Sequence, residues 1–519
     1  MSTSAPAAAD GDPPASPGSW LHDRSLAAGL AVLASMVFLG AIIRLGWLSD
    51  DAFVSFRAID NLVSGRGLVS NVGERVQGFT NPLWTLLVAL AYWPSGDIYG
   101  SAMVLSLLCC LGTVYFVWRL HGGGWRTAWT LLLLAMSVRF AGFSTGGLEN
   151  CLAHLLLAAF FYLSTRQPVT SPWFWLLGGL VVLNRLDHAL LVLPALWLVA
   201  ARDWRQSWRR CLLGLAPLAA WFLFAIVYYG FPYPNTAYAK LNAAIPLGAH
   251  IAQGLAYLTD SVFTDPLVLP VILLSILATL WARPRSRLLL AHGVGVVLYL
   301  LYVCGIGGDF MSGRFLTAPF LVAVLLLSEQ VDRQPLAAVA LAAVALLTGH
   351  RLLAPVPSDV GTVCSVPASG IVDERGCYVE HTGLAQNVRT KKFKRHPYFQ
   401  EGIGLRDGPK RVVVNDGPGL AGFAAGPGVH TIDPMALTDP LLARIAFRPG
   451  GDWRPGHFTR PVPDGYPESV ERGENLLKDP CARDLLTDLW LITRGPLFSG
   501  GRWRAIARRN LVARTCPAP

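Results

Sequence analysis

Residues 25–47 read SLAAGLAVLASMVFLGAIIRLGW, an apolar stretch interrupted only by the charge of Arg44. A helix needs about 20 such residues to cross the hydrocarbon core of a bilayer. The preceding residues 1–24 are rich in Ala, Ser, Pro and Gly and lack the apolar core and cleavage site of a signal peptide. We therefore expect a disordered cytoplasmic tail followed by an uncleaved membrane-spanning helix.

The composition of the whole chain also indicates a membrane protein. Of its 519 residues, 53% are hydrophobic and only 15% are charged, and the mean hydropathy is +0.44. A soluble domain carries about 25% charged residues. The net charge of +10 suits cytoplasmic loops rich in Lys and Arg, so we expect a lipid bilayer and no nucleic acid as partner. Collagen-like, disordered and disulfide-scaffold classes are excluded.

Further apolar stretches bring the expected number of membrane crossings to eleven. Pro82–Trp93 is too short for a confident crossing and is interpreted as a juxtamembrane or re-entrant helix. With the N-terminus inside, most Arg residues fall in cytoplasmic turns, whereas the outward turns hold single basic residues, which is the positive-inside pattern. The ten further stretches are 101–120, 127–143, 148–165, 172–184, 188–201, 211–229, 266–282, 288–304, 315–328 and 335–350.

The chain changes character after about residue 350, where Gly, Pro and charged residues become frequent. We predict an α-helical polytopic membrane protein, with a transmembrane domain over 25–354 that includes a first outer loop at 48–100. An odd number of crossings places residues 355–519 outside as a small α/β domain. The four cysteines of this domain are an even number in an oxidising compartment. Local pairs, Cys364 with Cys377 and Cys481 with Cys516, are favoured among three connectivities.

The first outer loop opens with two adjacent acids, Asp50 and Asp51, before an apolar pattern at 51–64 that predicts an amphipathic helix at the membrane interface. The two carboxylates could simply cap this helix and complement its dipole. We favour a functional role because adjacent carboxylates at a membrane boundary are costly unless they are used. Successive helical residues point about 100° apart, so one acid is expected to act and the other to hold the loop or an acceptor.

Other outward turns carry polar residues that together suit a lipid-linked anionic substrate. Arginine and lysine can bind a phosphate, and carboxylates can act as general bases, while charge neutralisation can replace a general acid at a phosphate leaving group. Each residue alone has a simpler explanation. Glu149 can complement a helix dipole, Arg185 and Asp187 can neutralise each other, and His188 is more often an interfacial histidine than a base.

Six separated blocks, in order, resemble a known family. They include residues 50–84, STGGLEN at 144–150, NRLDHAL at 184–190, YYGFPYPNTAYAKL at 228–241 and GGDFMSGR at 307–314, followed by RPGHFTRPVPDGYPES and other blocks in the tail. The chain resembles GT-C glycosyltransferases of membranes, and most closely the terminal arabinofuranosyltransferases of the AftB type and their relatives labelled ZomB. The resemblance implies a GT-C fold, a polyprenyl-phosphate sugar donor, and a C-terminal domain that can bind carbohydrate.

The resemblance implies transfer of arabinofuranose from decaprenyl-phosphoryl arabinose onto a cell-envelope glycan, outside the bacterial plasma (inner) membrane. Two alternatives stay open: the same chemistry with another sugar or with lipopolysaccharide, pilin or another surface glycan as acceptor, and a non-catalytic membrane protein that controls the flagellar motor. An acid pair can bind Mg²⁺ or Mn²⁺, although a monophosphate donor needs a cation less than a pyrophosphate does. We assign Asp50 and Asp51 to catalysis, Arg75, Asn81, Arg185, Asn235, Lys240, Asp309 and Arg314 to the donor, and Glu74, Glu149, Asp187 and His188 to the acceptor or to support.

Overall fold

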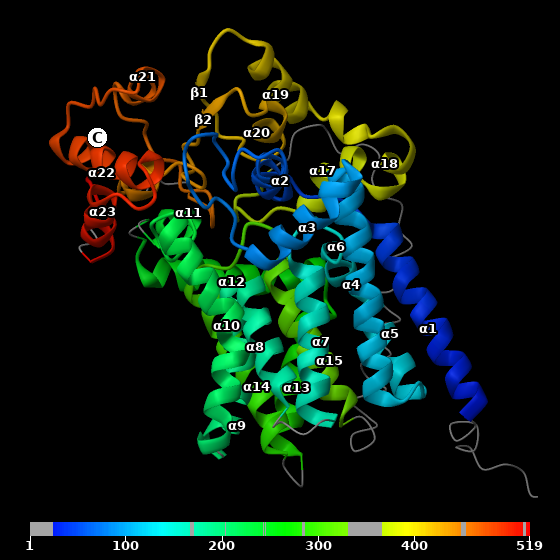
Figure 1. Cartoon of the computed structure of the whole chain (residues 1–519). Helices are drawn as coiled ribbons and strands as arrows, with labels where there is room; N and C mark the ends of the chain where they lie inside the picture. Colours follow the sequence, from blue (N-terminus) through cyan, green and yellow to red (C-terminus); the bar gives the residue numbers. More distant parts are fainter. Residues whose placement is uncertain are drawn as a thin grey trace, which may run out of the picture.

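The computed structural model describes residues 24–166, 171–202, 204–241, 243, 245–282, 286–330, 366–447, 453–511 and 515–518. Long helices lie side by side at one end of the molecule, and the chain from residue 366 onward, here called the C-terminal part, lies over the other end (Figure 1). The predicted N-terminal tail, the predicted crossing at 335–350, and Cys364 fall outside the described residues.

Each predicted crossing within the described residues coincides with a helix or, at 127–143, with two helices broken at Ser137. The long helix α12 was not predicted, because His250, Gln253 and Asp260 interrupt its apolar sequence. The helices are α1 Arg24–Leu45, α4 Ile98–His121, α5 Trp125–Met136, α6 Val138–Phe143, α7 Asn150–Arg166, α8 Pro172–Asn184, α9 Ala189–Arg202, α10 Trp204–Tyr228, α12 Leu247–Thr264, α13 Val268–Trp281, α14 Arg287–Gly305 and α15 Thr317–Ser328.

The described helices give a smaller number of clear membrane spans than the eleven expected. Four are long and apolar enough to cross a membrane: α1, α4, the Ser207–Tyr228 portion of α10, and α14. The pair α12 and α13 bends by 108° and forms a fifth span if it crosses as one unit. Several others, such as α8, are shorter than the roughly 20 residues that a complete crossing needs. The count of eleven is therefore not confirmed.

The first outer loop forms α2 (Asp50–Val63) and α3 (Pro82–Ser95). Ser49 caps α2, because its hydroxyl accepts a hydrogen bond from the amide of Ala52 at 3.3 Å. The apolar pattern of α2 is real, but the helix packs between α3 and α20 (Leu420–Ala425) and its Phe53 is fully buried. Protein therefore covers this helix, which the sequence placed at the membrane interface.

The C-terminal part is mainly helical, and its sheet consists of two parallel strands. Val412 pairs with His430 and Val414 with Ile432 in this sheet. The elements are α17 Glu374–Thr382, α18 Leu384–Thr390, η5 Lys392–Arg395, α19 Pro397–Asp407, β1 Val412–Val414, α20 Leu420–Ala425, β2 His430–Ile432, η6 Leu442–Arg444, α21 Tyr466–Arg472, α22 Pro480–Arg494 and α23 Gly500–Leu511.

Two hydrophobic cores join the C-terminal part to the helical bundle. The larger core runs from the bundle helices into the C-terminal part, where Phe393 stacks on Tyr99 of α4 with ring centroids 5.5 Å apart. A second core packs α22 and α23 against Phe231 and against Ala239 of α11 (Asn235–Leu241). Because the cores are shared, the C-terminal part determines the position of the first outer loop.

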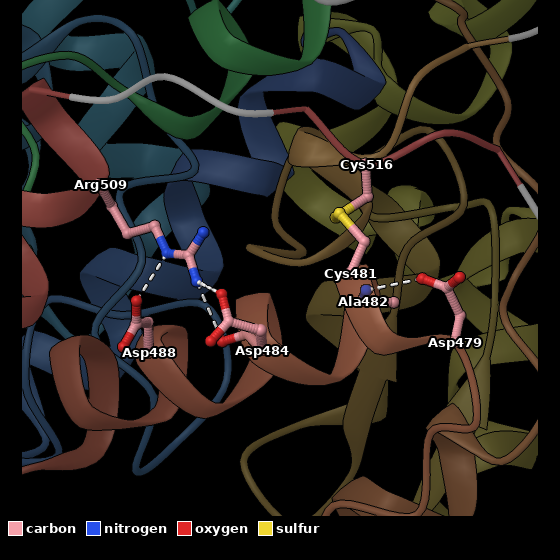
Figure 2. The surroundings of a disulfide bond; sticks show 7 residues. All are labelled: Asp479, Cys481, Ala482, Asp484, Asp488, Arg509 and Cys516. Carbon is pink, nitrogen blue, oxygen red and sulfur yellow. Dashed lines mark hydrogen bonds and ion pairs between the residues drawn. A yellow bond between two sulfur atoms is a disulfide. The ribbon is translucent and has the colours of Figure 1, made fainter.

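A disulfide between Cys481 and Cys516 ties the start of α22 to the chain after α23 (Figure 2). It is one of the two pairs favoured by sequence separation. Beside it, Arg509 of α23 forms ion pairs with Asp484 at 2.6 Å and Asp488 at 2.8 Å on α22. The two terminal helices are thus held together covalently and electrostatically.

Candidate active site

The loop between α6 and α7 places Glu149 beside the start of α2. Gly147 has φ +73°, and a Cβ there would lie 2.7 Å from the Cβ of Ala52, so glycine permits this close approach. The Ser49 amide donates to the Gly146 carbonyl at 3.0 Å. The Trp84 indole of α3 donates to the Gly147 carbonyl at 2.8 Å. The backbone of the α2 cap residue and a side chain of α3 therefore fix the position of this loop.

Glu149 is fully buried and binds two arginines at once. Its carboxylate lies 2.6 Å from Arg185 Nη1 and 3.2 Å from Arg314 Nη2, and it accepts a 2.8 Å hydrogen bond from the Asn81 amide. Burial by itself would raise the pKa of Glu149, but the two guanidiniums and the amide outweigh it and hold the pKa well below its usual value. Glu149 is therefore an ionised anchor, a role beyond the helix dipole.

The turn after α8 gives Arg185 a second carboxylate. Arg185 Nε lies 2.7 Å from Asp187 Oδ1, so the expected mutual neutralisation of these two residues occurs. The Tyr299 hydroxyl of α14 donates to the other Asp187 oxygen at 3.2 Å. His188 is buried and packs against the Tyr299 ring at 5.6 Å, which fits a packing role. Arg185 is thus held firmly between two acids, with the Phe315 ring centroid 4.3 Å away.

The two adjacent acids of α2 point in different directions, as the helical geometry predicts. Asp51 Oδ2 lies 3.5 Å from Arg314 Nη1, and its side chain is 33% exposed. Asp50 faces α20, where its carboxylate accepts a 2.8 Å hydrogen bond from the Leu420 amide. A Cβ on Gly419 would overlap that carboxylate, so glycine is required for this contact. Asp51 is therefore the acid directed at the cationic cluster, and Asp50 joins α2 to the C-terminal part.

The surroundings raise the pKa of both acids. For Asp50, burial raises the pKa to about 7; the Leu420 amide opposes the shift and the Asp51 carboxylate adds to it. For Asp51, burial also raises the pKa, and the Arg314 guanidinium opposes this shift. A carboxyl with a pKa raised toward neutrality can exchange a proton with a reacting group more easily.

Arg314 also faces Asp309, across a loop that the C-terminal part holds in place. Asp309 Oδ2 lies 3.7 Å from Arg314 Nη1 and has no hydrogen-bond partner among the described residues. Val372 donates from its amide to the Phe310 carbonyl at 2.7 Å and accepts from the Ser312 amide at 3.0 Å. These two bonds fasten the loop that carries Asp309 and Arg314.

Two further cations lie at this junction. Lys240 at the end of α11 is exposed, forms no ion pair with the residues that the structure describes, and interacts electrostatically with Asp309 and Asp51. The Arg454 guanidinium lies 5.8 Å from the Phe310 ring centroid and also interacts with Asp51. Lys240 is therefore the cation with the most freedom to meet an incoming anion.

Three predicted site residues lie elsewhere, at the interface between the outer loop and the C-terminal part. Arg75 donates to the main-chain carbonyls of Ile492 and Gly495. Asn235 donates to the carbonyls of Ala436 and Asp439, each at 2.9 Å. Glu74 pairs with Arg494 at 3.1 Å and with His430 at 3.8 Å. The structure gives these three side chains a joining role, which for Glu74 agrees with the expected supporting role, and we do not carry Arg75 and Asn235 into the donor site.

Sequence reasoning missed two charged residues of the cluster. Arg454 opens the block RPGHFTRPVPDGYPES, so a signal for it was present. Glu374, the first residue of α17, is only 6% exposed and interacts electrostatically with Asp51, Asp50 and Asp309. Its surrounding sequence, IVDERG, has no feature that separates it from an ordinary loop.

The sequence left open whether the acid pair holds a divalent cation. Among the described residues, no group of three or more His, Cys, Asp or Glu side chains is arranged to hold a metal ion. Mg²⁺ or Mn²⁺ at Asp50 and Asp51 therefore stays a prediction.

Comparisons with known proteins give two enzymes with the same name. The chain is 30% identical to the terminal β-(1→2)-arabinofuranosyltransferase of Mycobacterium tuberculosis (strain ATCC 25618 / H37Rv), over 85% of this chain and 88% of the relative. It is 29% identical to the protein of that name from Corynebacterium glutamicum, over 52% of this chain and 46% of the relative. No protein-family model matches.

Among solved structures, the chain is similar to ArnT from Cupriavidus metallidurans bound to undecaprenyl phosphate. The TM-score is 0.45 and the sequence identity 14%, over 80% of this chain and 86% of that one. The apo form of the same protein gives the same TM-score and identity, over 79% of this chain.

Proposed function

This chain belongs to the family of terminal β-(1→2)-arabinofuranosyltransferases, and we propose that it transfers an arabinofuranosyl residue from a polyprenyl-phosphate donor to a cell-envelope glycan. The proposed donor is decaprenyl-phosphoryl arabinofuranose and the proposed linkage is β-(1→2). The membership itself makes the chain a membrane glycosyltransferase. Donor, linkage and acceptor are the parts that need a test.

The observation that carries the proposal is the accessible acid Asp51 set against Arg314, with the exposed Lys240 nearby. A phosphate-linked sugar donor brings negative charge, which grows on the phosphate as the sugar leaves. Arg314 and Lys240 can take up that charge, and guanidinium binds phosphate oxygens well. Asp51 supplies the carboxylate that such a transfer needs.

The reaction balances with these groups. The bond from C1 of arabinofuranose to the phosphate oxygen breaks, and its electron pair leaves with the polyprenyl phosphate. A bond forms from C1 to the acceptor hydroxyl oxygen, whose proton passes to Asp51. Glu149 and Arg185 hold Arg314 in place during this exchange, because Glu149 binds both arginines.

We place the site on the outer side of the bacterial plasma membrane. The support is the distribution of basic residues, which concentrates arginine at the other ends of the helices. Figure 1 shows α2 beside the C-terminal part, so in this arrangement both lie on the side proposed for the glycan acceptor.

The test uses the purified full-length chain in lipid nanodiscs, with decaprenyl-phosphoryl arabinofuranose as donor and an arabinoside acceptor. Mass spectrometry should show one added pentose with the wild type and none with Asp51→Asn. No added pentose with the wild type would contradict the donor, and envelope glycans from cells with and without the protein would then identify another sugar. Full transfer after chelation with EDTA would contradict the predicted divalent cation.

A further inference from the structure

The buried carboxyl group of Glu374 is the strongest feature that the proposed reaction has not yet used. It begins α17, where Asp373 accepts from the Gly376 amide as the helix cap. The preceding strand-like segment is fastened to the Asp309–Arg314 loop through Val372, and Asp373 is itself paired with Arg139 at 2.6 Å. These contacts hold Glu374, a residue of the C-terminal part, close to the Asp309–Arg314 loop.

Charged groups of several separate segments interact electrostatically with Glu374. Asp50 and Asp51 belong to α2, and Asp309 and Arg314 belong to the loop before α15. From the C-terminal part come Arg454, whose charge interacts with Glu374, and Tyr378, one helical turn further along α17. On the neighbouring η5, Lys392 pairs with Glu380 at 3.3 Å instead.

Among the described residues, the Glu374 side chain has no ion-pair or hydrogen-bond partner, unlike the carboxyl groups around it. Glu149 and Asp187 have arginine partners within 3 Å, and Asp51 and Asp309 share Arg314. The Glu374 carboxyl forms no ion pair or hydrogen bond with the residues that the structure describes, although it is only 6% exposed. A buried carboxyl group among other carboxylates, without a cation of its own, is stable chiefly in its protonated form.

We propose that Glu374 is a catalytic acid supplied by the C-terminal part, which donates its proton to the departing phosphate. The inference rests on the proposed function. As the C1–O bond breaks, the Glu374 proton passes to a phosphate oxygen of the leaving polyprenyl phosphate, while Asp51 accepts the proton of the acceptor hydroxyl. A proton then returns from Asp51 to Glu374, directly or through water, and both groups regain their starting states.

The electrostatic surroundings agree with this assignment. Burial raises the pKa of Glu374 well above its usual value, the carboxylates of Asp51, Asp50 and Asp309 add to the shift, and Arg314 opposes it. These surroundings therefore favour the protonated acid over the carboxylate. Because the protonated form is the active one, transfer slows as the pH rises through the pKa of Glu374.

The first experiment measures kcat and KM for the donor against pH, using full-length wild type, Glu374→Gln, Glu374→Asp and the control Glu380→Gln in nanodiscs. Glu380 lies on the same helix and its side chain is 43% exposed. We expect Glu374→Gln to lower kcat about 10²-fold or more, to leave KM within about threefold, and to abolish the alkaline decline of the pH profile. Glu374→Asp should recover part of kcat, and Glu380→Gln should behave as wild type.

A second measurement does not depend on turnover. Infrared difference spectra of wild type minus Glu374→Gln at pH 8 should show the C=O stretch of a protonated carboxylic acid. Absence of that band overturns the proposal whatever donor the enzyme uses. An active wild type with an equally active Glu374→Gln also overturns it, while leaving the proposed function intact. A wild type that transfers no arabinofuranose but shows the band contradicts the proposed function and supports a proton-carrying Glu374.

Discussion

Two polar clusters lie between the bundle and the C-terminal part, and they use their charges differently. In the reaction cluster (Asp51, Glu149, Arg185, Asp309, Arg314), guanidiniums meet carboxylates, and Arg314 is shared among three of them. In the interface cluster (Glu74, Arg75, Asn235, Arg444, Arg494), Arg75 and Asn235 donate to main-chain carbonyls. Main-chain carbonyls keep the same charge throughout a reaction, whereas carboxylates can gain or lose a proton. The interface cluster holds one carboxylate, Glu74, which pairs with Arg494 at 3.1 Å, whereas three carboxylates share Arg314 in the reaction cluster. The comparison teaches that the cluster with several carboxylates around one arginine is the better candidate for proton exchange.

The two clusters also differ in access. Asp51 is 33% exposed and the neighbouring Lys240 is exposed, so a substrate can reach the reaction cluster. Glu74 is 2% exposed, and the Arg444 guanidinium lies 4.0 and 4.5 Å from the ring centroids of Phe231 and Tyr238. The interface cluster therefore holds the two parts of the molecule together.

The largest expected effect tests the reaction cluster directly. Asp51→Asn removes the proton acceptor and the charge that faces Arg314, so kcat should fall about 10²–10⁴-fold. The matched control is Asp60→Asn on the same helix, whose partners are the partly exposed Arg66 at 2.9 Å and the Tyr92 hydroxyl at 2.9 Å. Unfolding temperature should be unchanged in both variants. Equal kcat for the two variants would remove Asp51 from the mechanism.

The next effect concerns stability. Glu149→Gln leaves Arg185 and Arg314 buried with one carboxylate fewer, and breaking such a buried pair costs about 3–5 kcal/mol. Denaturant unfolding of the detergent-purified protein measures this loss of unfolding free energy. Glu380→Gln, a partly exposed pair, should cost no more than about 1 kcal/mol. Similar losses in both variants would contradict the anchoring role of Glu149.

A smaller effect on stability should distinguish the interface cluster from the reaction cluster. Arg75→Met removes the donor to the half-buried Gly495 carbonyl, whereas the Ile492 carbonyl keeps its hydrogen bond from Arg502, so the change should cost about 0.5–1.5 kcal/mol. The unfolding free energy should fall by that amount, while kcat per folded molecule stays within about threefold. A loss of kcat larger than tenfold, at unchanged stability, would return Arg75 to the donor site.

The smallest effect is a pH dependence of stability that comes from Asp50. Its pKa rises from 3.8 to about 7 on folding, so the folded state holds this proton more tightly than the unfolded state. The stabilising contribution is full below about pH 4, declines as the pH rises to about 7, and is absent above. Water partly screens the half-buried carboxyl group, which keeps the effect modest.

The measurement is the difference in unfolding free energy between wild type and Asp50→Asn across pH 4–8. Asparagine keeps the acceptor for the Leu420 amide but cannot titrate, so the difference should shrink as the pH rises. A difference that is constant over this range would show that Asp50 does not change its pKa on folding.

The local features of the fold could be predicted from the sequence because a few neighbouring residues decide them. The apolar run at 25–47 became α1, the Ser49 cap began α2, and the 100° step between Asp50 and Asp51 separated their directions. The family resemblance carried by the ordered blocks is confirmed by the match over most of a relative. The number of membrane crossings could not be derived from residue composition. It depends on the break at Ser137 and the bend between α12 and α13, which packing decides.

The tertiary structure alone decided which polar residues meet. Arg314 is 165 residues from Glu149 in the chain, and Leu420 is 370 residues from Asp50. No periodicity or helix cap connects residues so far apart in the chain. The sequence therefore could not show that Arg75 and Asn235 lie away from the reaction cluster, or that Glu374 belongs to it. By itself the sequence determined most helices of the bundle, the acidic start of α2 and the family. Shared burial of apolar surface determined the rest, because it brings remote segments together and thereby chooses which charges face each other.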